Sequence, residues 1–214
     1  MSDEFDDVTK KVVEFYKENP FPNYDDNDNK ITILSKGDKS YLKNLKKLIG
    51  YNKKILEVGC GTGQYSNYFA IGTNNMIYAL DPAYNSIKLA QNFSDKNNIK
   101  NIKYINGSIF DDIFEKESFD LVFGSGVLHH TQDTYLGFKK CSELVKKNGY
   151  LLIGLYNLYS RFSLNKILYK IFGKKGVIFD PILKDKKQSK ASIDAWIKDQ
   201  YEHPVERSHS IEEL

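Results

Sequence analysis

Three segments of the sequence hold residues whose types and spacing could do chemistry. Glycines alternate with other residues in the loop 59–63, and Asp81 follows an apolar stretch farther along the chain. Alternating glycines let a backbone turn sharply and approach a ligand closely. An acid at the end of a strand accepts hydrogen bonds from ribose hydroxyls. His129 and His130 are adjacent, and histidine titrates near neutral pH. The sequence therefore indicates a nucleoside site beside a candidate base.

Apolar strands and amphipathic helices alternate around these segments. Such alternation predicts βαβ units and an α/β fold with a doubly wound, mostly parallel sheet covered by helices on both faces. The glycine-rich loop joins the first strand to its helix, where doubly wound folds bind nucleosides. The strands are expected at 54–58, 76–80, 102–105, 119–124 and 149–156. Helices are expected from the glycine loop to about 71, at 84–93 and at about 134–146.

Further helices are expected on either side of this alternating region. Apolar residues at helical spacing predict a helix over 3–18, followed by an extended segment and a polar loop at 25–30. A second helix is expected at about 38–50, capped by Asp38. A basic amphipathic helix over 164–172 has three interpretations: it packs onto the domain, covers a substrate pocket or contacts a membrane surface.

The composition of the loop narrows the kind of nucleoside. A dinucleotide fingerprint has the form G-x-G-x-x-G, but here Gln64 stands at the sixth position and Gly63 at the fifth. A nicotinamide-dependent oxidoreductase is therefore disfavoured. The loop also lacks the G-K-[ST] of triphosphate-binding loops. Both observations favour a nucleoside without a pyrophosphate.

The segment from Glu57 to Gly63, EVGCGTG, closely resembles the first motif of class I S-adenosylmethionine-dependent methyltransferases, particularly the type 11 methyltransferase group. The resemblance covers about residues 53–155 and includes further motifs in the same order. Asp81 matches the acid that binds ribose. The other matching segments are NGSI at 106–109, FDLV at 119–122, GVLHH at 126–130 and LVKKNGY at 144–150.

The resemblance implies S-adenosylmethionine as the cofactor and a Rossmann-like methyltransferase fold. Ser108 replaces the acid that usually faces the adenine amine, and a hydroxyl accepts that hydrogen bond more weakly. The hairpin that completes the family's sheet is not found before Leu214, so we expect a fragment that lacks it. The implied cofactor-binding residues are Glu57, Gly59, Cys60, Gly61, Gly63, Asp81, Pro82, Ser108, Ile109 and Ser125.

Methyl transfer from a sulfonium is an in-line displacement, which needs a base only when the acceptor loses a proton. His130 and His129 are the candidate catalytic bases beside the expected methyl position, with His130 favoured. The alternative is that one ring braces the helix that follows. No metal site is expected, because no cysteine or close pair of acids would complete a ligand set with His203 and His209.

The leading function is therefore methyl transfer to a small-molecule acceptor. The alternatives are an RNA methyltransferase, which the basic helix allows, and a non-catalytic S-adenosylmethionine-binding protein. Nucleic acid is disfavoured, because the net charge is only +3 and the fourth strand ends in Gly-Ser-Gly rather than an Asn-Pro-Pro-type motif. The expected organisation is a helical cap at 1–50, a cofactor-binding core at 51–156 and a truncated substrate-side or lid segment at 157–214.

Two cysteines and an acidic N-terminus without a secretory signal predict a reduced, cytoplasmic compartment. No membrane span is expected. The acceptor atom and the oligomeric state stay open.

Overall fold

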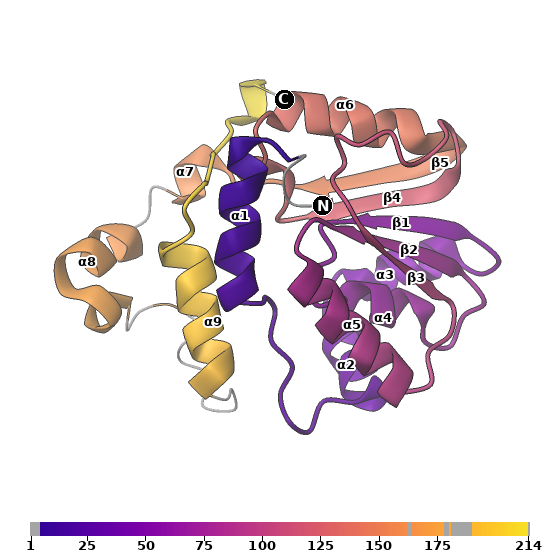
Figure 1. The fold of residues 1–214 in the computed structure, drawn as a ribbon, viewed down its shortest axis with the longest axis horizontal. Coiled ribbons are helices and arrows are strands. Elements are labelled where there is room, and N and C mark those ends of the chain that lie inside the picture. The colour runs from indigo at the N-terminus through magenta and orange to yellow at the C-terminus, as the bar shows by residue number, and fades with distance from the viewer. Residues whose placement is uncertain (1–4, 162–163, 178–179, 181–189, 214) are drawn as a thin grey trace.

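The computed structural model describes residues 5–161, 164–177, 180 and 190–213. Its five strands are all parallel and form one sheet in the order β3-β2-β1-β4-β5 (Figure 1). The order reverses between β1 and β4, which is the switch point of a doubly wound fold. The expected fold class is confirmed. The strands are β1 (Lys54–Val58), β2 (Met76–Asp81), β3 (Ile102–Asn106), β4 (Phe119–Ser125) and β5 (Val145–Gly154).

Helices cover both faces of the sheet, α6 on one and α2–α5 on the other (Figure 1). Side chains alternate between the faces along each strand. Ile55 on β1 therefore packs with Phe123 on the face of α2–α5, whereas Leu56 packs with Val122 on the face of α6. The helices are α2 (Lys30–Asp38), α3 (Leu42–Ile49), α4 (Gln64–Ala70), α5 (Tyr84–Lys96) and α6 (Thr134–Leu144).

Two helices from distant parts of the chain lie side by side beyond the carboxyl ends of the strands (Figure 1). They are α1 (Asp7–Glu18) and α9 (Lys190–Tyr201). Tyr16 on α1 donates a hydrogen bond of 2.7 Å to Asp199 on α9. The helix α8 (Leu164–Phe172) lies farther out, and the short helix α7 (Leu158–Arg161) lies near the top of α1 in this view (Figure 1). In the described ranges, no helix is long and apolar enough to cross a bilayer.

The region before β1 differs from the expectation. The sequence predicts a loop at 25–30 and a helix capped by Asp38, but α2 already begins at Lys30 and Asp38 is its last residue. A reciprocal capping box explains this start, because Asn29 accepts from the backbone of Thr32 and the Thr32 hydroxyl accepts from the backbone of Asn29. Asp38 instead accepts a 2.8 Å hydrogen bond from the Tyr68 hydroxyl.

The later boundaries also differ. Helix α6 ends at Leu144, and β5 begins at Val145 rather than at 149, because Val145 pairs with Phe119 before a register shift. Among the described residues after β5 no further strand occurs, and only an isolated bridge joins Asn157 to His209.

Phe123→Ala is expected to lower the free energy of unfolding by about 3–5 kcal/mol. The ring is fully buried on β4 and makes edge contacts with Tyr65 and Phe69, so its removal leaves a cavity that the rigid sheet cannot close. Urea unfolding measures the change. The matched control is Leu48→Ala, because Leu48 is 59% exposed and its loss should cost little. Equal effects of the two substitutions would contradict this packing.

Candidate active site

A cavity of about 860 Å³ lies where β1 and β4 part at the switch point of the sheet. The carboxyl ends of the strands and the loops after them form one wall. Helices α1 and α9, with the segment between α1 and α2, form the opposite wall. The cavity therefore joins the glycine-rich loop to surfaces from both ends of the chain.

The glycine-rich loop needs glycine for steric reasons. Gly59 has φ +67°, and a Cβ there would lie 2.4 Å from the side chain of Val127. Gly61 has φ +51°, and its Cβ would lie 2.3 Å from the carbonyl oxygen of Phe21. Both line the cavity, whereas Gly63 is not among the lining residues. Gly63 has φ +79° and supports the turn into α4.

Every backbone N–H from residue 59 to 63 donates to the protein itself. The acceptors are the Leu80 carbonyl, shared by residues 59 and 60, then the Asp81 carboxylate for Gly61, the Phe21 carbonyl for Thr62 and the Cys60 carbonyl for Gly63. A pyrophosphate site needs such N–H groups turned toward the phosphates. The loop therefore fits a nucleoside without phosphates, such as S-adenosylmethionine, better than a dinucleotide.

Asp81 lies at the end of β2 and lines the cavity beside Pro82. Its carboxylate accepts 2.8 Å hydrogen bonds from the N–H of Gly61 and of Ala83. Burial raises the pKa of Asp81 to about 6, although these two hydrogen bonds oppose the shift. The carboxylate is thus mainly ionised at neutral pH. Each oxygen retains a second lone pair that can accept a ribose hydroxyl.

Ser108 and Ile109 follow β3 and line the cavity on the side of Asp81, and Ser125 lines it at the end of β4. The Ser108 hydroxyl accepts a 3.3 Å hydrogen bond from the N–H of Phe110, and a hydroxyl oxygen has a second lone pair. Asp111 is not among the lining residues, because its carboxylate accepts from the N–H of Ser108 at 2.7 Å. Of these two residues, Ser108 is therefore the one whose side chain faces the cavity.

Glu57 and Cys60 also line the cavity. The Ser66 hydroxyl, on α4, donates to the Glu57 carboxylate. Burial raises the pKa of Glu57 to about 8, against the opposing effect of this hydrogen bond. Burial likewise raises the pKa of the Cys60 thiol, so this cysteine acts as a small buried side chain of the loop.

Glu57→Gln is expected to make stability less dependent on pH. The folded-state pKa of about 8 exceeds the ordinary 4.5, so the folded chain binds the Glu57 proton more tightly than the unfolded chain. Stability from this group is therefore lost as pH rises between these two values. Urea unfolding across that range should show a smaller decrease for Glu57→Gln than for the wild type. The exposed Glu14→Gln is the control, and equal slopes in all three proteins would contradict the assignment.

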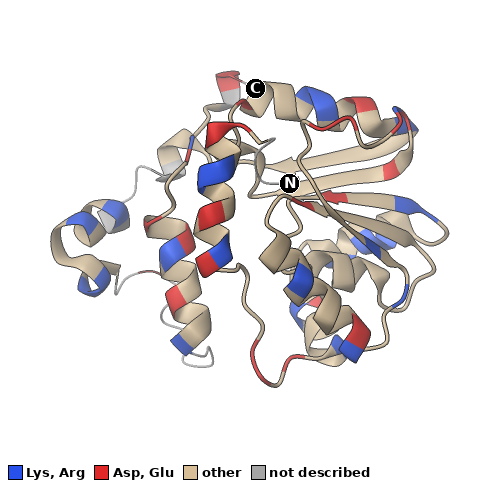
Figure 2. Ribbon diagram, in the orientation of Figure 1, with Lys and Arg blue, Asp and Glu red and all other residues tan. Residues whose placement is uncertain are grey.

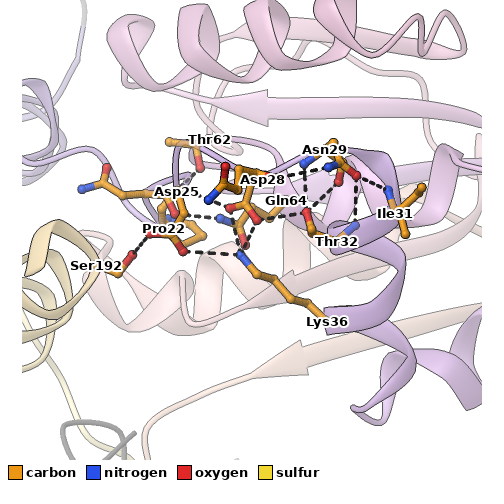
Figure 3. Close-up of polar contacts among 12 residues, drawn as sticks. Pro22, Asp25, Asp28, Asn29, Ile31, Thr32, Lys36, Thr62, Gln64 and Ser192 are labelled. Atoms are coloured by element: carbon orange, nitrogen blue, oxygen red, sulfur yellow. Dashed lines mark hydrogen bonds and ion pairs between the residues drawn. The ribbon is translucent and has the colours of Figure 1, made fainter. Parts of the chain in front are cut away.

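The segment 19–28 passes over the glycine-rich loop and closes one side of the cavity (Figure 3). The Thr62 hydroxyl donates to the carbonyl of Pro22, and Gln64 donates to the carbonyl of Asn23 at 3.0 Å. Asp25 accepts a 2.9 Å hydrogen bond from Ser192 of α9. The segment thus connects the cofactor loop to the helix on the opposite wall.

The two histidines of the 3₁₀ helix η2 (Leu128–His130) occupy different positions. His130 lines the cavity, together with Thr131 and Tyr156. His129 is fully buried, stacks on the ring of Tyr156 at 3.8 Å and is not among the lining residues. Of the candidate pair, only His130 is therefore placed to touch a ligand.

Helix α9 contributes a stripe of cavity-lining residues that the sequence analysis did not assign to a helix. They stand at positions 192, 196, 199 and 200, a spacing that brings them onto one helical face. Asp180 accepts hydrogen bonds from the Trp196 indole at 3.1 Å and from Tyr201 at 2.8 Å, which fixes the indole in the wall. Helix α9 is buried on several sides, so it shows no single apolar stripe. The stripe consists of Ser192, Trp196, Asp199 and Gln200.

Comparison with known proteins identifies the family. The model of a methyltransferase domain matches residues 49–207, which is more than half of the chain. The chain belongs to this methyltransferase domain family. S-adenosylmethionine is the cofactor of the family, in agreement with the loop and Asp81 geometry. The recognition made from the sequence motifs is confirmed.

Curated relatives share part of this methyltransferase domain. The ubiquinone biosynthesis O-methyltransferase of Glaesserella parasuis is 29% identical over 112 residues, which are 50% of this chain and 47% of that protein. The enzyme of the same name from Pelagibacter ubique is 26% identical over 129 residues, covering 59% of this chain and 50% of that protein. The chain spans about half the length of these relatives.

Solved structures show the same fold. The PH0226 protein of Pyrococcus horikoshii superposes with a TM-score of 0.52 at 22% identity, covering 69% of this chain and 68% of that one. A S-adenosylmethionine-dependent methyltransferase of Thermotoga maritima, described as a possible histamine N-methyltransferase, gives 0.51 at 17% identity over 94% of this chain and 76% of its own. At these identities the likeness concerns the fold alone.

Proposed function

We propose that this methyltransferase domain transfers the methyl group of S-adenosylmethionine to a small molecule held between His130 and the wall formed by α1 and α9. The observation that carries the proposal is the continuity of the cavity. One space runs from Asp81 and the glycine-rich loop past His130 to Trp196. A cofactor and an acceptor can therefore meet in it at close range.

The acceptor half of the cavity has the character of a small-molecule site. Phe21, Val12 and Trp196 supply apolar surface, and the hydrogen-bonded pair of Tyr16 and Asp199 supplies polar groups. Small-molecule sites combine a mainly apolar lining with a few polar groups that set orientation. A hydroxyl acceptor is favoured, because the curated relatives are named O-methyltransferases.

A reducing compartment belongs to the proposal, since Cys60 and Cys141 are both free and buried.

The residues of the site divide the work of transfer. When bound, S-adenosylmethionine supplies an electrophilic methyl group on a sulfonium. Asp81 would hold the ribose, and Ser108 and Ile109 would flank the adenine. His130 would accept the proton that a hydroxyl acceptor loses as its oxygen gains the methyl group. The α1 and α9 helices exclude water and orient the acceptor.

A panel of acceptors tests the proposal. The chain is incubated with S-adenosylmethionine and with catechol, tyramine or a short RNA, and S-adenosylhomocysteine is measured by mass spectrometry. The sole tryptophan, Trp196, lies in the acceptor wall, so its fluorescence reports occupancy independently of turnover. The proposal expects a fluorescence change and turnover with a small molecule. Turnover with RNA alone would replace the acceptor class, and cofactor binding without any turnover would favour the non-catalytic alternative.

A further inference from the structure

The segment that follows α9 touches His130 directly. The carbonyl oxygen of Val205 lies 2.6 Å from Nδ1 of the His130 ring. A carbonyl oxygen only accepts hydrogen bonds, so Nδ1 must carry the hydrogen. In a neutral imidazole the other nitrogen, Nε2, is then the one with a lone pair. The chain thereby determines which nitrogen of His130 can act as a base.

His203, in the same segment, contacts both partners of this hydrogen bond. The ring of His203 stacks on the ring of His130, with 3.8 Å between centroids and 30° between planes. Nδ1 of His203 accepts a 3.2 Å hydrogen bond from the N–H of Val205. His203 thus restrains the plane of His130 and the peptide that bonds it. Burial, assisted by the nearby His130, lowers the pKa of His203 to about 3, so this ring stays neutral.

The tail is also bonded to the residues on either side of His130. The N–H of Arg207 donates to the carbonyl of His129 at 3.0 Å, and the Arg207 guanidinium donates to the carbonyl of Thr131. These contacts hold the segment 203–207 against η2. Because these contacts already restrain the His130 ring, it loses less conformational entropy when it reaches its reacting geometry.

We propose that the segment 203–207 is a positioning element for methyl transfer, which holds His130 as the tautomer whose Nε2 accepts the proton of the acceptor. In that step the acceptor O–H bond breaks and its proton moves to Nε2. As the acceptor oxygen gains the methyl group, the bond between that methyl and sulfur would break with its electron pair left on sulfur, so that S-adenosylhomocysteine is released and the positive charge ends on the imidazolium. The role as base rests on the proposed function, whereas the tautomer is a property of the protein alone.

Long-range ¹H–¹⁵N spectra of the ¹⁵N-labelled chain test the tautomer. They are recorded at a pH at which the imidazole rings are neutral. The chain has four histidines, so single substitutions assign the signals. We expect His130 as the Nδ1–H form. An Nε2–H form, or a mixture of the two, would overturn the proposal. This readout needs no acceptor, so a protein without turnover but with the Nδ1–H form counts against the proposed function and leaves the tautomer assignment intact.

Variants of His203 test the positioning role. His203→Ala removes the ring and the acceptor for Val205, and we expect mixed tautomers of His130, about a tenfold lower kcat and unchanged affinity for S-adenosylmethionine. His203→Phe keeps the stacked ring, and we expect it to restore most of kcat. The control is His209→Ala, whose ring contacts Thr134 instead, and which should leave the His130 signals unchanged.

Thermal unfolding shows whether each variant is folded. If His203→Ala does not fold, the comparison of His203→Phe with His203→Asn separates the two contacts, because Asn keeps an acceptor for the Val205 N–H but no ring. Wild-type tautomer and wild-type kcat in a folded His203→Ala would overturn the positioning role. If that variant does not fold, the same result in His203→Asn, which lacks the stacked ring, would overturn it.

Discussion

Asp81→Ala is expected to weaken the binding of S-adenosylmethionine by at least about a hundredfold. The substitution removes the carboxylate that would accept hydrogen bonds from the ribose, and hydrogen bonds to a charged acceptor each contribute about 1.5–3 kcal/mol. It also removes the acceptor for the N–H of Gly61, so the glycine-rich loop loses an anchor. Titration calorimetry measures the affinity of the wild type and the variant.

Two further proteins separate the ribose contact from a general loss of structure. Asp120→Ala removes an acid from the start of β4, at the opposite end of the strands, and should bind the cofactor as the wild type does. Asp81→Asn keeps an oxygen for the loop but not the charge, and its affinity should be intermediate. The affinity of the wild type should also decrease as pH falls through about 6, where Asp81 becomes protonated. An Asp81→Ala protein with wild-type affinity would contradict the ribose assignment.

His130→Ala is expected to lower kcat by about 10²–10³-fold while leaving cofactor affinity nearly unchanged. The ring lines the cavity between the cofactor loop and the α9 wall, so its loss removes a proton acceptor and leaves the loop untouched. Steady-state turnover with the acceptor found in the panel measures kcat. Calorimetry with S-adenosylmethionine measures the affinity.

His129 supplies the comparison for this second experiment. Its ring packs on Tyr156 and is fully buried. We therefore expect His129→Asn to lower the free energy of unfolding and to leave kcat of the folded protein little changed. A loss of kcat confined to His129→Asn would reverse the roles of the two histidines. Equal losses of kcat and cofactor affinity in His130→Ala would indicate a structural histidine instead of a base.

The core of the fold follows from local patterns, which is why the sequence predicts it. Each buried strand is a short apolar run, and the glycine-rich loop is a contiguous segment whose steric needs only glycine meets. Asp81 and Ser108 follow strands, so their positions at the sheet edge are implied by the order of elements. These residues all line one cavity.

The acceptor wall depends on contacts between residues far apart in the sequence, and no local pattern encodes them. Tyr16 meets Asp199, and His130 meets Val205, only after α1, η2 and the tail have packed together. His203 likewise stacks on His130 only once the segment after α9 has packed against η2. Helix α2 is different, since its start is encoded locally: the capping box of Asn29 and Thr32 begins the helix directly after the polar run.

Charge adds little to the positioning of the site. Helix α1 carries acids and lysines in equal number, whereas α8 carries lysines and no acid (Figure 2). None of the described residues of α8 lines the cavity, in contrast to those of α9. Of α8 and α9, α9 is therefore the one whose side chains can select an acceptor.

Calorimetric titration of the chain with S-adenosylmethionine, S-adenosylhomocysteine and NAD tests the central claim most directly. The fully engaged N–H groups of the glycine-rich loop and the carboxylate of Asp81 predict micromolar binding of both sulfur nucleosides and none of NAD. Binding of NAD, or a folded chain that binds neither sulfur nucleoside, would contradict the account.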